Sequence, residues 1–225
     1  MALSSAAQNP WVDWGYVRDN RDTILTALEQ HVTLTLTTVV IGTLIALPLA
    51  VVARRWRWLR GPVIGTAGVL YTIPSLALFS LLAPWTGIGA RTVLIGLVMY
   101  ALLLLVRNVL AGLDGVPDEV REAARGMGYG PVRMLLVVEL PIALPAVMTG
   151  IRLATVSTVA LVTVGVVVGY GALGGLIVSG FDNNFYKAQI FTATALCVLL
   201  ALLLDLLLQL ATRLLVPWAR GRAAA

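Results

Sequence analysis

Long apolar stretches separated by short polar segments dominate this chain of 225 residues. A helix needs roughly 20 apolar residues to cross a bilayer, because each residue rises about 1.5 Å and the hydrocarbon core is about 30 Å thick. The pattern predicts an all-α integral membrane protein whose transmembrane domain covers residues 27–215. Five stretches have the length and hydropathy of transmembrane helices: 32–53, 63–82, 92–110, 145–168 and 188–210.

Polar and irregular segments separate these predicted spans. Residues 1–26 form a polar lead-in and residues 216–225 a short tail. Pro74 interrupts the second span, and a break is expected there because proline has no N–H and its ring clashes with the preceding turn. The longest polar segment covers residues 114–141, and a glycine-rich stretch covers residues 169–180.

The composition excludes a soluble domain and most catalytic chemistry. Hydrophobic residues make up 59% of the chain and charged residues 12%, which a soluble fold of this size cannot accommodate on a surface that faces water. Cys197 and His31 are single residues of their kind, so a disulfide framework and the usual histidine-based metal sites are excluded. We expect His31 to lie at the membrane interface, and we expect neither enzyme activity nor a cofactor or metal bound by this chain.

The basic residues predict the orientation in the membrane. With five spans, the loops at 54–60 and 114–141 lie on the same side as the C-terminus. That side holds Arg54, Arg55, Arg57, Arg60, Arg121, Arg125, Arg133, Arg213, Arg220 and Arg222. The other side holds Arg18, Arg21, Arg91 and Lys187. Because basic residues are enriched in cytoplasmic loops, the N-terminus is predicted to be outside and the 114–141 loop cytoplasmic. The net charge of +5 is therefore explained by basic residues in the loops next to the membrane, and we expect no nucleic-acid partner.

The 114–141 loop has the pattern of two short helices that meet at a sharp angle. Pro117 suits the first turn of a helix, and the two acidic residues that follow it suit the positive end of the helix dipole. The glycines at positions 126, 128 and 130 end this helix and allow a tight turn. Pro131 then starts a second helix, which ends before Pro141.

A spaced motif within this loop resembles a known family. Glu122-Ala123-Ala124 is followed after three residues by Gly128, and after nine more by Val138-Glu139-Leu140-Pro141. This resembles the coupling motif of ABC importer permeases, with Val138 in place of the usual isoleucine. Small alanines allow another protein to approach the backbone, and charged neighbours supply polar contacts at the rim. The residues expected to couple to an ATPase are Glu122, Ala123, Ala124, Arg125, Gly128, Leu140 and Pro141.

Three further segments resemble one branch of that family, the permeases of glycine betaine, carnitine and choline importers. They are 71–78 (YTIPSLAL), 141–152 (PIALPAVMTGIR) and 168–177 (VGYGALGGLI). Ala172 stands where that branch usually has glycine, a departure that bears on the local backbone rather than on the family. The resemblance covers roughly residues 30–210.

The resemblance implies the type I ABC importer permease fold, a prokaryotic plasma (inner) membrane location and a division of labour. An extracytoplasmic binding protein would capture the solute, and two ATPase subunits would bind ATP and Mg. A second permease, either a copy of this chain or a paralogue, would complete the path. The solute implied is a quaternary ammonium compatible solute. This sequence has no glycine-rich phosphate loop ending in Gly-Lys-Ser/Thr, so we do not expect it to bind ATP.

Two groups of residues are candidates for the translocation path or its gate. They are Tyr71, Pro74, Ser75 and Phe79 in the second span, and Gly169, Gly171 and Gly174 after the fourth. Aromatic ring faces attract a quaternary ammonium, and a broken helix exposes carbonyls where a cavity can satisfy them. The alternative for each group is packing, through a proline kink, through aromatic rings in the core or through small residues between helices.

Asp205 lies within the fifth predicted span and should pair with a cation. An unpaired aspartate at the centre of a membrane helix costs about 2.5–3.5 kcal/mol. Arg107 and Arg152 lie at comparable depths and are the candidate partners. A structural ion pair is favoured over a solute or proton site.

Other functions remain open. A five-span amino-acid permease of the methionine type would share the coupling loop. A non-transporting membrane anchor subunit would not require the full motif spacing. An intramembrane enzyme would require paired carboxylates or further histidines, which this sequence lacks. Co-purification with an ATPase distinguishes the importers from the others.

Overall fold

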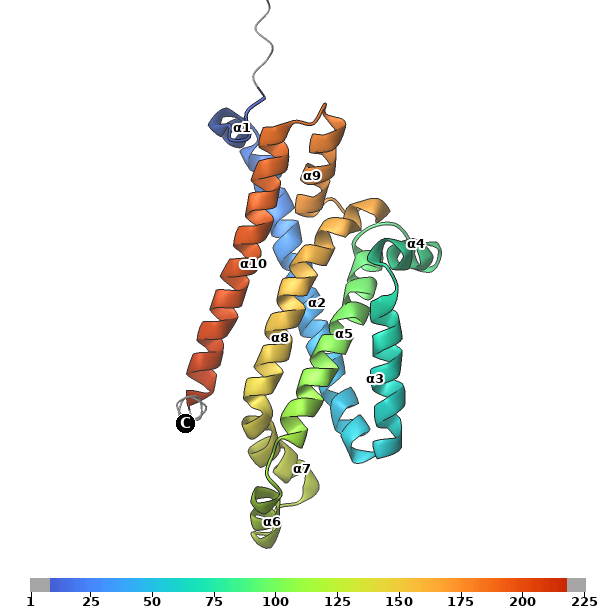
Figure 1. Cartoon of the computed structure of the whole chain (residues 1–225), viewed down its shortest axis with the longest axis vertical. Coiled ribbons are helices and arrows are strands. Elements are labelled where there is room, and N and C mark those ends of the chain that lie inside the picture. Colours follow the sequence, from blue (N-terminus) through green and yellow to red (C-terminus); the bar gives the residue numbers. More distant parts are fainter. Residues whose placement is uncertain (1–8, 218–225) are drawn as a thin grey trace, which may run out of the picture.

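The computed structural model describes residues 9–217, and every regular element in that range is helical. Four helical segments there are long and apolar enough to cross a membrane: α2 (Arg21–Arg55), α5 (Ala90–Asp114), the segment Pro131–Val168 that contains α8 (Leu140–Val162), and α10 (Lys187–Leu215). They run along the long axis of the molecule (Figure 1). Helices suit a bilayer because they satisfy their own backbone groups where water is absent.

The predicted span 63–82 is not one continuous helix. It lies on α3 (Arg57–Thr72) and α4 (Ser75–Thr86), which meet at an angle of 101°. Ile73 is extended before Pro74, because the proline ring disfavours the helical conformation of the preceding residue. The Tyr100 hydroxyl donates a hydrogen bond to the carbonyl of Ile73. The described chain therefore has four candidate spans, or five if the bent pair counts as one.

The N-terminal lead-in contains a short helix and the start of α2. In α1 (Trp14–Asp19), the Asp13 side chain caps the first turn by accepting from the backbone N–H of Gly15 at 2.8 Å. The Tyr16 ring packs edge to face on Tyr186, with 5.3 Å between ring centroids. Residues 1–8 of the predicted lead-in and 218–225 of the predicted tail lie outside the described residues.

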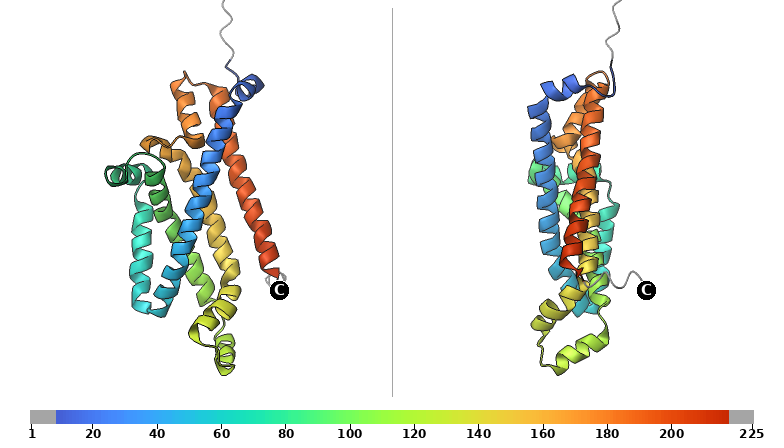
Figure 2. Two further views of the ribbon diagram at one scale, coloured as in Figure 1. Left: turned by 180° about the vertical axis from the view of Figure 1, so that it is seen from behind. Right: turned by 90° about the vertical axis from the view of Figure 1, so that its left-hand side faces the viewer.

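The glycine-rich stretch after α8 is largely helical. Helix α8 continues into a 3-10 segment, η2 (Thr163–Val168), and Gly169 then turns the chain with φ +77°. Helix α9 (Ala172–Asp182) follows and returns beside α10 (Figures 1 and 2). Ala172 has φ +43°, a left-handed conformation that glycine adopts at lower cost. The alanine that stands here in place of the glycine expected from the resemblance therefore carries a backbone cost.

Helix α5 forms the centre of the bundle and packs closely on α2 and α8. A Cβ at Gly112 would lie 2.8 Å from the Ala143 carbonyl oxygen, and one at Gly150 would lie 2.6 Å from the Asn108 Cβ. Without hydrophobic drive between helices in lipid, such small residues allow the backbones to approach and increase dispersion contacts. The largest core cluster is centred here, with Leu105, Val106, Val109, Leu110 and Leu113 almost fully buried.

Two polar groups join helices within the bundle. His31 of α2 is fully buried and its Nε2 lies 2.9 Å from the Val159 carbonyl oxygen of α8. The expectation of an interfacial His31 was therefore wrong, since α2 begins a full three turns before residue 32. Arg152 of α8 makes two hydrogen bonds to Asp205 of α10, at 2.8 and 2.9 Å. Asp205 thus pairs with Arg152 rather than with Arg107.

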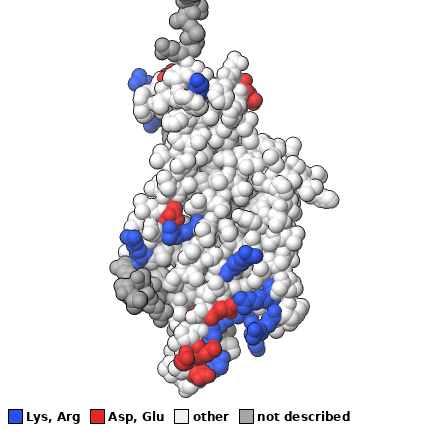
Figure 3. All heavy atoms as spheres, viewed as in Figure 1, with Lys and Arg blue, Asp and Glu red and all other residues white. Residues whose placement is uncertain are grey.

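The 114–141 loop lies at the end of the molecule opposite α1 and α9 (Figure 1). It contains α6 (Asp118–Gly126), α7 (Pro131–Met134) and a π-helical turn, η1 (Leu135–Glu139). Charged side chains gather at this end, and a broad band with few charges crosses the middle of the molecule (Figure 3). This distribution fits a protein whose middle lies in hydrocarbon.

Replacing Gly174 with alanine is expected to destabilise the protein by about 1–3 kcal/mol, because its Cβ would overpack a backbone contact. That Cβ would lie 2.6 Å from the Cα of Thr163. Thermal unfolding in detergent measures the effect. Gly175→Ala is the matched control, since a Cβ there meets nothing within 4 Å. Equal stability of the two variants would contradict the close contact between α9 and η2.

Separating Arg152 from Asp205 is expected to destabilise the protein by about 1.5–3 kcal/mol, the scale of a charge-assisted hydrogen bond. Arg152→Met and Asp205→Leu each leave one charge without its partner, whereas the double variant removes both. Thermal unfolding should show partial recovery in the double variant. A stable double variant that has lost transport would instead indicate a functional role for the pair.

Candidate functional site

The turn after α6 is built from glycine geometry and backbone hydrogen bonds. Gly128 has φ +80°, a left-handed conformation common just after a helix. Its N–H donates to the Arg125 carbonyl at 2.9 Å, and the N–H of Tyr129 donates to the Ala124 carbonyl at 3.0 Å. A Cβ at Gly128 would meet open space, so conformation rather than crowding explains glycine here.

Helix α6 exposes one face and packs the other. Glu122, Ala123 and Arg125 are exposed, whereas Ala124 is 1% exposed. Asp118 and Glu119 occupy the first turn, and Pro117 precedes it, so the acidic side chains lie at the positive end of the helix dipole. The motif's two alanines therefore differ: Ala123 is on the outer surface and Ala124 anchors the helix.

Leu140 and Pro141 lie away from this outer face, at the start of α8. Both are partly buried. The π-helical turn η1 ends at Glu139, directly before them. Pro141 cannot donate to the helix ladder, and a widened turn is a recognised way in which a helix accommodates such a break. The structure thus separates the motif into an exposed part on α6 and a part that shapes the entry to α8.

Glu139 forms an ion-pair cluster that the sequence analysis missed. Its carboxylate accepts two hydrogen bonds from Arg54 of α2, at 2.9 and 2.8 Å, and one from Arg121 of α6, at 3.0 Å. Glu139 is 9% exposed. A buried carboxylate needs cations as partners. The position of Glu139 inside the apolar run 134–144 was therefore a sequence signal that it would be buried and paired.

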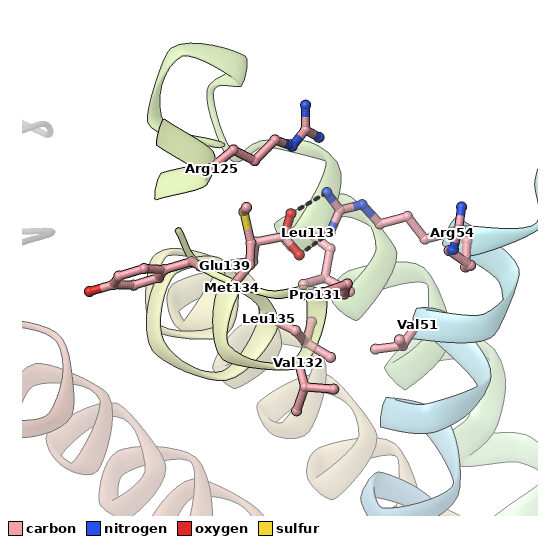
Figure 4. Close-up of a pocket in the computed structure, with 11 residues that line it drawn as sticks. Val51, Arg54, Leu113, Arg125, Pro131, Val132, Met134, Leu135 and Glu139 are labelled. Carbon is pink, nitrogen blue, oxygen red and sulfur yellow. Dashed lines mark hydrogen bonds and ion pairs between the residues drawn. The ribbon is translucent and has the colours of Figure 1, made fainter. Parts of the chain in front are cut away.

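A hollow of about 740 Å³ opens beside this cluster. Its lining combines apolar side chains such as Val51 and Leu135 with the guanidinium groups of Arg54, Arg55 and Arg125. Figure 4 shows Arg54 directed at Glu139 from α2, with Arg125 on the α6 side. The Arg54–Glu139 pair therefore joins the 114–141 loop to α2 at the edge of this hollow.

The predicted path residues do not form one group. Tyr71 and Ser75 line a cavity of about 320 Å³ together with Tyr100 and Ser157. The Tyr71 and Tyr100 rings meet edge to face, with centroids 5.8 Å apart. Pro74 lies at the helix break, in the N-cap position directly before α4.

Phe79 lies in the core rather than in this cavity. It is fully buried in a cluster with Leu97 and Val162. A Cβ at Gly96 would lie 2.6 Å from its ring, so Gly96 makes room for it. This burial is what the packing alternative for Phe79 predicts.

The three glycines after α8 differ in their surroundings. Gly169 makes the turn, and a Cβ there would lie 2.8 Å from Ile88 Cγ2. Gly174 packs against the backbone of Thr163. Gly171 lines a separate hollow of about 470 Å³ beside Gln30 of α2. Gly174 thus allows close backbone packing, whereas a side chain at Gly171 would meet nothing within 4 Å.

Within residues 9–217, no group of three or more His, Cys, Asp or Glu side chains is placed to hold a metal ion.

The comparisons with known proteins point in one direction. Residues 23–221 match the family described as binding-protein-dependent transport system inner membrane component. The chain is 37% identical over 207 residues to an osmoprotectant import permease protein, OsmW, of Salmonella typhimurium, covering 90% of this chain and 96% of the relative. It is 33% identical over 203 residues to a choline transport system permease protein, OpuBB, of Bacillus subtilis, covering 90% and 93%.

Solved structures agree on the fold. An inward-facing structure of the MetNI methionine ABC transporter matches with a TM-score of 0.78 at 21% identity, covering 88% of this chain and 98% of that one. An amino acid ABC transporter solved with histidines matches with a TM-score of 0.70 at 18% identity, covering 90% and 98%. At such identities the likeness shows the fold alone, the type I ABC importer permease fold. The family recognised from the coupling motif is confirmed: this chain belongs to the binding-protein-dependent transport system inner membrane components.

Proposed function

We propose that this permease forms the path for a quaternary ammonium osmoprotectant such as glycine betaine, choline or carnitine. The observation that carries the proposal is the extent of the similarity, 37% and 33% identity over about nine-tenths of the chain to permeases named for osmoprotectant and choline transport. A relative of Bacillus subtilis named for glycine betaine, carnitine and choline is 32% identical over 202 residues. The methionine transporter is 21% identical, so its similarity shows the fold and does not support methionine as the solute of this permease.

We propose that two ATPase subunits dock on the exposed face of α6 and bind ATP and Mg. Glu122, Ala123 and Arg125 form this face, and the small Ala123 leaves room for a partner's groove. Gly128 sets the turn that follows α6, Ala124 packs the inner face of α6, and Leu140 and Pro141 shape the entry to α8. A second permease subunit and an extracytoplasmic binding protein complete the importer.

The proposed orientation places the N-terminus outside and the C-terminus in the cytoplasm. The end that carries α6, α7 and the turn between α2 and α3 holds the larger share of the arginines, as cytoplasmic ends do. In this orientation α1 and α9 face the binding protein, and α6 faces the ATPase.

We propose that the solute passes the cavity between α3, α5 and α8. Tyr71 offers a ring to a quaternary ammonium, and Ser75 and Ser157 supply hydroxyl groups. The break at Pro74 lies at this cavity, where a non-helical backbone is tolerated in a membrane. Gly169 and Gly171 stay candidates for a gate at the outer end, and the Arg152–Asp205 pair is assigned a structural role.

Reconstitution tests the proposed solute. The complete complex, with its ATPases and binding protein in proteoliposomes, should take up glycine betaine, choline or carnitine in an ATP-dependent manner. Each of these three solutes and methionine should be tested singly. Uptake of methionine with no uptake of the three quaternary ammonium compounds would overturn the proposed solute, and absence of ATP-dependent uptake of any solute would overturn the importer.

Ala123→Trp is expected to reduce co-purification of the ATPase at least about tenfold, because a large side chain on the docking face prevents close approach. The permease itself should accumulate normally, since Ala123 is exposed. Ala90→Trp is the control, because Ala90 is also exposed but begins α5 at the opposite end. Unchanged co-purification in Ala123→Trp would contradict docking at α6.

A further inference from the structure

Glu139 is the point at which three parts of the chain are joined by charge-assisted hydrogen bonds. Arg54 lies one residue before the end of α2, and both of its terminal nitrogens donate to Glu139. Arg121 lies in the middle of α6 and donates through Nε at 3.0 Å. Glu139 itself is the last residue before α8. One carboxylate therefore links α6 to two helices of the bundle.

Arg121 adds a fourth element to this joint. Its Nη2 donates to the Leu113 carbonyl at the end of α5, at 2.8 Å, and its Nη1 pairs with the exposed Asp118. The Arg121 side chain is 15% exposed and that of Glu139 11%. The low exposure of Arg121 and Glu139 makes the loss of one partner costly, because the other charge is then left buried and unpaired.

The connection that follows α6 is rich in glycine. The chain passes there through Gly126, Gly128 and Gly130, whereas Pro117 restricts the backbone before α6. Glycine lacks a Cβ and restricts the backbone least. The hollow of about 740 Å³ beside the cluster further reduces packing between the loop and the bundle. Whether α6 moves with the bundle therefore depends strongly on the noncovalent joint.

We infer that Glu139 is a positioning residue that, with Arg54 and Arg121, locks α6 to α2, α5 and α8 so that they move as one body. Displacement of α6 by an attached ATPase is then passed to α2 and α8, and rearrangement of the bundle is passed back to α6. The π-helical turn supports this assignment, since it places the carboxylate between the two arginines and such turns recur at functional sites. The inference rests on the proposed attachment of an ATPase to α6.

Glu139→Gln and Arg121→Gln test the joint in the reconstituted complex. Glu139→Gln keeps the size of the side chain and removes its charge, whereas Arg121→Gln keeps a polar side chain but removes the guanidinium group. The ATPase should still co-purify and hydrolyse ATP at the basal rate, because the exposed face of α6 is unchanged. Stimulation of hydrolysis by solute-loaded binding protein, and the uptake of solute per ATP, should both fall roughly tenfold, since a charge-assisted bond of the joint is lost.

Asp114→Asn is the matched control. Asp114 binds Arg60 of α3 at 2.7 Å and lies 3.8 Å from Arg54 Nε, but it makes no bond to α6 among the described contacts. Neutralising it should leave uptake per ATP near the wild-type value. Loss of uptake per ATP in Asp114→Asn equal to that in Glu139→Gln would show a general charge effect and overturn the inference.

The remaining outcomes also decide the question. Unchanged uptake per ATP in both variants would overturn the inference. A proportional fall of basal hydrolysis, stimulated hydrolysis and uptake in both would assign the cluster to folding alone and would also overturn it. If Glu139→Gln does not accumulate, Arg121→Gln decides, because it detaches α6 while Arg54 still binds Glu139. Wild-type complex without ATP-dependent uptake would overturn the proposed function instead.

Discussion

Inside a bilayer every backbone N–H and C=O must find its partner within the protein, and this constraint underlies the whole structure. It explains why the regular elements between residues 9 and 217 are all helices. It also explains how the chain breaks a helix. At Pro74 the Ile73 carbonyl accepts a hydrogen bond from the Tyr100 hydroxyl. After Gly169 the backbone N–H of Ala172 donates to the side-chain oxygen of Gln30, at 3.2 Å. Each break is thus covered by a side chain from another element.

The same constraint applies to charges. Arg152 and Asp205 are remote in sequence but meet between α8 and α10, and Glu139 is neutralised by arginines from α2 and α6. These pairs differ in what they join. The first links two helices of the bundle, whereas the second links the bundle to the loop that we propose contacts an ATPase. A charge requirement imposed by burial can in this way become a mechanical connection between a membrane bundle and a partner.

The coupling motif has two physical parts, and its spacing follows from them. Glu122 and Ala123 face outward from α6, while Ala124 and the turn at Gly128 set how α6 lies on the bundle. Leu140 and Pro141 act elsewhere, at the start of α8, where the missing N–H of Pro141 accompanies the π-helical turn. The intervening residues are those needed to cross from the end of one short helix to the start of the long one.

The membrane class, the family and the positions of most helices could be predicted from the sequence, because hydropathy over some 20 residues and a spaced motif are local properties. The sequence also indicated the break at Pro74 and the need of Asp205 for a partner. The pairing of Asp205 with Arg152, the burial of Phe79 and His31, and the close approach of Gly174 to Thr163 could be seen only in the folded structure. The folded structure also revealed the Arg54–Glu139–Arg121 cluster. These outcomes depend on which helix faces meet, and residues 85 positions apart carry no local signal of their contact.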